Sequence, residues 1–204
     1  MPSALTPEPL DVPVNAAIGL PAASVGTFEE LYDAHVDFAW RSARRLGVDE
    51  LGADDVVQQT FLIVHRRLGE FKGRSSVKTW IFSILLRVVQ DHRRTLRRKS
   101  PHTLHAPVDP DLVADGAAGS NPHEALERAD ASRTIDLLLE SLDGDKRVVF
   151  VMAELEEMTA DEIGQVTGLD RQAVYSRLRA ARTDFERAAA RMRRTVLRDE
   201  RSHR

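Results

Sequence analysis

The stretch FKGRSSVKTWIFSILLRVVQDHRRTLRRK, residues 71–99, combines an apolar stripe suited to a protein core with a concentration of positive charge. Its apolar residues recur at the spacing of an α-helix: Val77, Ile81, Ile84, Leu85 and Val88. A polar and basic stripe runs beside them: Thr79, Ser83, Arg87, Gln90 and Arg94. The pattern predicts a helix, capped by Ser75 or Ser76, that packs on one side and presents charge on the other.

Charge is strongly segregated along the chain, although the net charge of its 204 residues is only −3. Residues 66–99 are rich in lysine and arginine, residues 109–161 are predominantly acidic, and residues 171–204 are basic again. Two basic blocks indicate two surfaces that face polyanions, with an acidic stretch between them. For each block taken alone, the alternative is an ordinary solvated helix face.

Several classes of function are disfavoured by composition. The chain contains no cysteine, no apolar run of membrane-spanning length, and no signal-peptide pattern at its start. We therefore expect a cytoplasmic protein without membrane insertion. His102 and His105 form an isolated pair in a proline-rich segment, and Asp54 and Asp55 diverge by about 100° on a helix, so neither pair predicts a metal or catalytic site. We expect no enzymatic activity, no metal and no cofactor.

The first part of the chain is predicted to be helical after a flexible tail that covers residues 1–26. A capping box of Thr27 and Glu30 opens a helix that ends at Gly47. The next helix is expected to begin near residue 53, which places Asp54 and Asp55 in its first turn. Residues 100–121, with three prolines and no sustained period, are predicted to form an extended linker.

The second part is also predicted to be helical, because no stretch alternates convincingly with the period of a strand. Asn121 is expected to cap a helix that has Pro122 at its first position. Its start is followed by the apolar residues Leu126, Ile135, Leu137, Leu138 and Leu142. Another helix is predicted over residues 143–157. The fold class is therefore all-α, with two small helical domains.

A helix-turn-helix is predicted near the C-terminus. Thr159 and Glu162 form a capping box on a short helix, Gly168 ends it, and Asp170 caps the helix that follows. The second helix directs a polar and basic set outward: Arg171, Gln172, Tyr175, Ser176 and Arg179. In a helix-turn-helix such residues reach base edges in the major groove. The alternative is a helical hairpin with a solvated arginine face.

These segments resemble the sigma factors of bacterial RNA polymerase. Residues 54–94 match the pattern D-x-V-Q-x-x-F, then F-x-G-x-S-S-x-x-T-W-[LI]-x-x-I, ending in D-x-R-R. The stretch MTADEIGQVTGLDRQAVYSRLRAAR, residues 158–182, resembles the family's −35-reading region. With two regions and a short linker, the chain is similar to the extracytoplasmic function (ECF, group 4) branch. The resemblance implies a region 2 bundle over 27–99, a linker over 100–121, a region 4 helix-turn-helix over 122–192, and a basic tail over 193–204.

The resemblance implies that the first domain holds the −10 promoter element and helps to melt the duplex. The matching residues are Phe71, Lys72, Arg74, Ser75, Ser76, Lys78, Trp80, Arg87, Gln90, Arg93 and Arg94. The loop before the helix would form a pocket for a flipped base, while the basic side chains would hold phosphates. Trp80 either stacks on a base or fills the core, and its place beside the apolar stripe favours packing.

The resemblance also implies partners. The family binds the polymerase beta-prime clamp helices through a surface that corresponds here to Asp54, Asp55, Gln58, Gln59 and Leu62. Gln59 departs from the acidic residue usual in the family. The beta flap and promoter DNA are further expected partners. An anti-sigma factor is a candidate partner because this branch is often held inactive by one, although no residue identifies it. Acidic linker residues could mimic RNA charge or simply be polar.

The −35 element is expected to be read by Arg171, Gln172, Tyr175, Ser176, Arg179 and Arg182. Gln172, Tyr175 and Ala180 differ from the residues common in the family, which affects the promoter sequence rather than the mode of binding. The resulting hypothesis is an ECF sigma factor that directs promoter-specific transcription initiation with core polymerase. The alternatives are a stand-alone helix-turn-helix regulator and a module that docks acidic protein partners.

Overall fold

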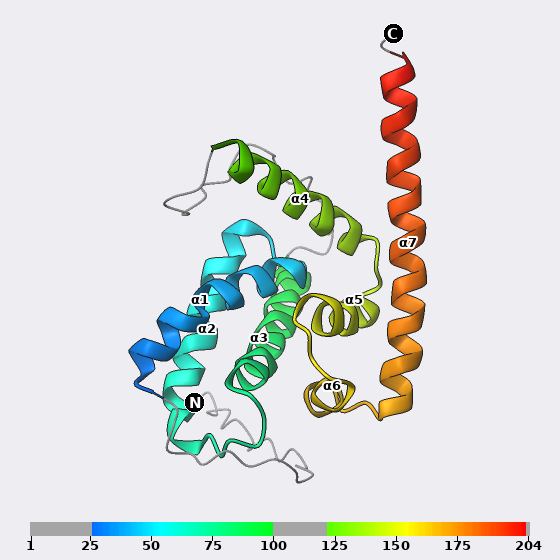
Figure 1. The fold of residues 1–204 in the computed structure, drawn as a ribbon. Helices are drawn as coiled ribbons and strands as arrows, with labels where there is room; N and C mark the ends of the chain where they lie inside the picture. Colours follow the sequence, from blue (N-terminus) through cyan, green and yellow to red (C-terminus); the bar gives the residue numbers. More distant parts are fainter. Residues whose placement is uncertain (1–25, 100–121, 203–204) are drawn as a thin grey trace.

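The computed structural model describes residues 26–99 and 122–202, which are helical apart from short turns (Figure 1). The predicted tail and linker, and with them His102 and His105, lie outside the described residues. The first half contains α1 (Phe28–Arg45), α2 (Glu50–Arg67), the 3-10 turn η2 (Leu68–Glu70) and α3 (Val77–Lys99). The second contains α4 (Pro122–Glu140), α5 (Gly144–Phe150), the π-helical turn η3 (Val151–Leu155), α6 (Ala160–Thr167) and α7 (Arg171–Ser202).

Helices α1, α2 and α3 form a three-helix bundle around the apolar stripe of α3. The predicted capping box at Thr27 and Glu30 is present, and the Ser76 hydroxyl accepts a hydrogen bond from the Thr79 amide at 3.0 Å. Ile81, Ile84, Leu85 and Val88 are buried, as predicted. Thr79 is only 3% exposed, so its assignment to the polar stripe was wrong: it lies where α3 meets the second half of the chain.

Helix α2 begins one turn earlier than the sequence predicts. Asp49 caps it by accepting a hydrogen bond from the Gly52 amide at 2.7 Å. Asp54 and Asp55 therefore lie in the second turn rather than the first, where the helix dipole acts on them less strongly. The prediction missed this start because Leu51, the only large apolar residue there, is 91% exposed, and Gly52, although buried, is a poor helix former.

The second half differs from prediction at two places. The helix predicted over 143–157 is interrupted, since α5 passes into the π turn η3 and ends at residue 155. The predicted basic tail is not a separate tail, because α7 remains helical to Ser202. Leu137, one of the apolar residues of α4, is 56% exposed, because three consecutive leucines on a helix cannot all face the core.

The helix-turn-helix has the predicted caps. The Thr159–Glu162 capping box is present, Gly168 adopts the left-handed conformation at φ 75°, and the Asp170 carboxylate accepts from the Ala173 amide at 2.7 Å. Helix α7 then runs along one side of the molecule, far beyond α6 (Figure 1). The turn thus fixes the direction in which the first residues of α7 point.

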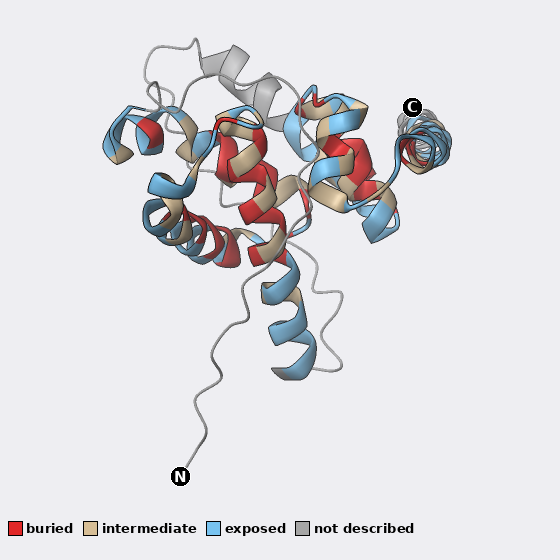
Figure 2. Cartoon of the chain, turned by 90° about the horizontal axis from the view of Figure 1, so that it is seen from below, coloured by how far each residue is buried: buried red, intermediate tan, exposed pale blue. Residues whose placement is uncertain are grey.

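The two halves share one continuous hydrophobic core. Buried residues from α1, α2 and α3 and from α5, η3, α6 and α7 belong to the same cluster. Figure 2 shows the buried segments of both halves facing each other, with the exposed face of each helix turned outward. The described residues therefore form a closed arrangement, in which the second half packs against α1 and α3.

Candidate nucleic-acid and polymerase interfaces

The loop before α3 folds back onto the helix it precedes. The rings of Phe71 and Trp80 pack with their centres 5.0 Å apart, and Gly73 is buried with φ 65°. Lys72 and Arg74 are exposed on either side of this glycine. The Phe71–Trp80 pair thus packs the loop against α3, and the exposed Lys72 and Arg74 side chains can bind an anionic ligand.

The predicted −10 residues on α3 do not all share one exposed face. Gln90 and Arg94 are exposed, with Arg94 paired to Asp91 at 3.3 Å, while Arg87 is half-buried. Arg93 turns toward the first helix and donates a hydrogen bond to the Leu46 carbonyl. Ser75 is half-buried and Ser76 is engaged as the helix cap. The structure brings the loop and the far end of α3 to the surface but directs Arg93 inward.

Lys78 lies between the two halves of the chain. Its ammonium group contacts the Glu156 carboxylate at 3.1 Å and lies 4.9 Å from the centre of the Phe38 ring. Lys78 also affects His35: burial, followed by the positive charge of Lys78, lowers the pKa of that imidazole below its ordinary value. In this arrangement Lys78 is engaged by protein groups.

The predicted polymerase-binding residues lie together on the outer face of α2. All five are exposed: Asp54, Asp55, Gln58, Gln59 and Leu62. The Trp40 indole of α1 donates a hydrogen bond to the Asp54 carboxylate at 3.0 Å, which fixes that side chain. The face is therefore a polar surface with Leu62, 47% exposed, as its apolar member.

The start of α7 presents the predicted −35 residues to solvent. Arg171, Gln172, Tyr175, Ser176 and Arg179 are all exposed. The Arg171 guanidinium makes two hydrogen bonds to the Asp161 carboxylate on α6, one of them at 3.0 Å. Arg182, about three turns further along α7, is held by Glu154 at 2.6 Å. Acidic side chains of α6 and η3 thereby position the two arginines in the free chain.

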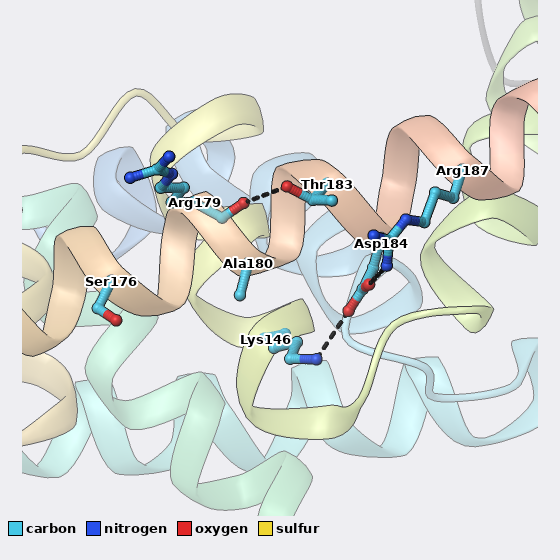
Figure 3. A pocket seen from close by; sticks show the side chains of 7 residues that line it. All are labelled: Lys146, Ser176, Arg179, Ala180, Thr183, Asp184 and Arg187. Atoms are coloured by element: carbon cyan, nitrogen blue, oxygen red, sulfur yellow. Dashed lines mark hydrogen bonds and ion pairs between the residues drawn. The ribbon is translucent and has the colours of Figure 1, made fainter.

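A shallow pocket of about 340 Å³ lies between α5 and α7 beside the same face (Figure 3). Lys146 reaches into it from α5 and binds Asp184 at 2.7 Å, while Arg179 and Arg187 line its ends. The sequence prediction missed Lys146, because it is 38 residues from its partner. It also missed Trp40, Ser42, Arg45 and Glu156, whose contacts join distant helices and leave no local pattern.

Two families match the chain. The Sigma-70 region 2 family matches residues 31–99, and the Sigma-70 region 4 family matches residues 132–185. The first match contains the loop, α3 and the exposed α2 face, and the second contains the helix-turn-helix. Among the described residues, no helix is both long and apolar enough to cross a membrane.

Relatives match across both regions. CnrH, an RNA polymerase sigma factor of Cupriavidus metallidurans, is 31% identical over 159 residues, which cover 76% of this chain and 82% of CnrH. The ECF sigma factor SigE of Mycolicibacterium smegmatis is 27% identical over 179 residues, which cover 86% of this chain and 67% of SigE.

Solved structures agree in fold. CnrH in complex with the cytosolic domain of CnrY superposes with a TM-score of 0.58 at 25% identity, covering 83% of this chain and 92% of that one. The sigma factor RpoE of Bartonella quintana, solved with the anti-sigma factor NepR, gives a TM-score of 0.62 at 17% identity, covering 80% and 96%. With regions 2 and 4 both present and in order, the chain belongs to the ECF branch of the sigma-70 family, whose members are alternative sigma factors for transcription initiation.

Proposed function

We propose that this sigma factor divides its work among three surfaces. Residues 27–99 dock core polymerase and hold the −10 element, residues 122–192 read the −35 element, and residues 100–121 join them. The observation that carries the proposal is the exposed face of α2, which lies in the same chain as an exposed recognition helix. A stand-alone DNA-binding regulator would not need a polymerase-binding surface, so binding of core polymerase by the α2 face distinguishes the two candidates.

The α2 face suits a basic partner. Two carboxylates and two amides surround Leu62, and within the described residues neither Asp54 nor Asp55 forms an ion pair with a lysine or arginine. Such a surface complements a basic helical hairpin, with Leu62 as the apolar contact and the polar groups setting orientation. We assign it to the clamp helices of the beta-prime subunit. The beta flap would be contacted by the second domain.

The loop and α3 suit a melted −10 strand. Lys72 and Arg74 flank the buried Gly73, and Arg87, Gln90 and Arg94 continue along α3. Neutralising phosphates with these side chains releases counterions, and stacking offsets the lost duplex stacking by about 1–3 kcal/mol per base. Trp80 packs on Phe71 in the free chain, so its first role here is to support the loop.

The second domain would recognise the −35 element through the first turns of α7. Arg171 and Gln172 lie nearest the capped end, and Tyr175, Ser176 and Arg179 follow on exposed positions. Arginine can read guanine and glutamine can read adenine. Arg182 would contact a phosphate. The protein would act in the cytoplasm, without catalysis or a cofactor of its own, and an anti-sigma factor would be a further partner.

Core docking can be tested by changing the α2 face. Asp55→Arg with Gln58→Ala should weaken binding to core polymerase on the order of tenfold or more, because a charge reversal meets a basic partner. The measurement is a titration of labelled chain with core polymerase, with helical content checked by circular dichroism. A matched control is Asp33→Arg, which makes the same charge reversal at an exposed position of α1, on another helix. Unchanged affinity in a folded α2-face variant contradicts the assignment.

A further inference from the structure

Glu156 is a buried carboxylate held entirely by the other half of the chain. Its side chain is 4% exposed and follows the π turn η3. One oxygen accepts from the Ser42 hydroxyl at 3.1 Å and from the Arg45 guanidinium at 2.9 Å. The other oxygen lies 3.1 Å from the Lys78 ammonium group. One hydroxyl and two cations from α1 and α3 therefore converge on a single anion.

This donor set has the composition of an oxyanion site. Taking a carboxylate out of water is costly unless cations and hydrogen-bond donors satisfy both of its oxygens, and all three donors do so here. A phosphodiester has the same feature, because its two non-bridging oxygens share one negative charge on a single phosphorus atom. Ser42 forms the floor of the site, and the longer side chains of Arg45 and Lys78 form its rim.

A second acidic contact covers the adjoining start of α3. The Glu162 carboxylate of α6 accepts a hydrogen bond from the Thr79 hydroxyl at 2.8 Å. Burial alone would raise the pKa of the Glu162 carboxyl, but hydrogen bonds from the Thr159 backbone and the Thr79 hydroxyl hold it below its ordinary value. Glu162 and Glu156 thus both contact the start of α3, which follows the loop proposed to hold the −10 strand.

We propose that Ser42, Arg45 and Lys78 form a binding site for a phosphate of promoter DNA, and that Glu156 occupies this site in the closed chain. The inference rests on the proposed function, since it places the phosphate next to the −10 loop. Glu156 and DNA then compete for the same three donors. Closed chains bind DNA weakly because only the fraction with the second domain released is competent.

The closed state can be followed in the full chain because the protein has no cysteine. Arg66→Cys on α2 and Glu186→Cys on α7, both exposed, accept a pair of fluorophores. Glu156→Gln keeps the shape of the side chain but removes its charge, so energy transfer should fall as the two halves separate. Glu157→Gln is the matched control, since it removes the same charge from the neighbouring exposed residue. Equal transfer in both folded variants overturns the inference.

DNA titrations test whether a DNA phosphate binds the site formed by Ser42, Arg45 and Lys78. The probe is a labelled 20-nucleotide single strand of mixed sequence, titrated at several NaCl concentrations. Glu156→Gln should bind it on the order of tenfold more tightly than wild type. Its slope of log affinity against log salt should steepen by about 0.7, as expected for one additional phosphate contact on a single strand. Adding Lys78→Met should remove both changes. An open Glu156→Gln chain with unchanged affinity and salt slope overturns the phosphate assignment.

A further variant separates this inference from the proposed function. Lys72→Ala with Arg74→Ala removes the exposed loop cations but leaves the Glu156 site intact. If that variant binds the strand as well as wild type, the proposed −10 surface is wrong, whatever Glu156→Gln does. If it binds weakly while Glu156→Gln binds like wild type, the −10 surface stands and only the present inference fails.

Discussion

Gly47 lies where two arginines meet the C-terminal end of α1. Arg147 of α5 donates to the Arg45 carbonyl at 2.5 Å, and Arg93 of α3 donates to the Leu46 carbonyl. Burial, followed by the nearby charge of Arg93, lowers the pKa of Arg147 to about 10, so it still carries its charge at neutral pH. These guanidiniums satisfy helix-end carbonyls that no backbone amide reaches.

Alanine at position 47 should therefore destabilise the protein. Gly47 has φ 89°, and a Cβ there would lie 2.8 Å from an Arg147 nitrogen and 2.9 Å from an Arg93 nitrogen. Backbone strain of this kind costs about 1–3 kcal/mol, and displacement of the guanidiniums adds to it. Urea unfolding measures the loss. Gly69→Ala is the control, since a Cβ there meets no atom within 4 Å. Equal stability of the two variants would contradict this role.

His35 should make stability depend on pH. Its pKa is lowered in the folded chain, first by burial and then by Lys78. Between that value and 6.5, the unfolded chain binds more protons than the folded one. The stabilising contribution is therefore complete above pH 6.5 and is lost as the pH falls through the folded pKa. Unfolding free energies of wild type and His35→Gln, measured from pH 7.5 to 5, should differ in slope. Parallel curves would show that His35 does not carry the effect.

The first turns of helix α7 have two faces: Val174, Leu178 and Ala181 pack against the core, while the residues proposed to read the −35 element are exposed. Arg171 is aligned by Asp161 and Arg182 by Glu154. An arginine held in place loses less freedom when it meets a base or phosphate. The Arg171–Asp161 and Arg182–Glu154 ion pairs are therefore compatible with DNA binding, because each carboxylate holds its arginine in an exposed position.

Substitutions along α7 should separate base reading from phosphate binding. Arg171→Ala or Gln172→Ala should relax preference at particular −35 positions, by about 1–3 kcal/mol for each lost pair. Arg182→Ala should weaken all promoters about equally and reduce the salt dependence. The measurement is transcription from a library randomised across the −35 element. A uniform loss for both classes of variant, with unchanged base preference, would mean that the early turns do not read sequence.

Local signals predicted the helices well. The capping boxes at Thr27 and Thr159, the turn at Gly168 and the cap at Asp170 are encoded within a few residues, and all are present. Interruptions were harder to predict. The π turn after Phe150 continues the apolar period of α5, so the sequence gives no sign that the hydrogen-bonding pattern changes there.

The arrangement of the two halves could not be predicted from local pattern. Glu156 is 114 residues from Ser42 and 78 from Lys78, and nothing near Glu156 in the sequence marks it as a buried anion. The family match likewise predicts which surfaces bind DNA and polymerase but not how they lie in the free chain. Lys78 was predicted to face DNA and Thr79 to lie on a polar stripe, and nothing in the sequence indicates that both contact the second half in the free chain.

The closed arrangement leaves the proposed polymerase-binding and −10-binding surfaces unequally accessible. The α2 face is open, whereas the start of α3 is partly covered by η3 and α6. Core polymerase could thus bind first, through α2, and promoter DNA would follow once the second half has moved. An order of this kind would keep the free protein from binding DNA without polymerase.

Reconstituted transcription tests the central claim most directly. Core polymerase with and without the full chain is given genomic DNA, and transcript 5′ ends are sequenced. A sigma factor should produce new start sites that share upstream −10 and −35 elements, and these starts should disappear when Asp55→Arg with Gln58→Ala replaces the wild-type face. Identical start sites with and without the chain, or promoter binding by the chain that needs no polymerase contact, would contradict the claim.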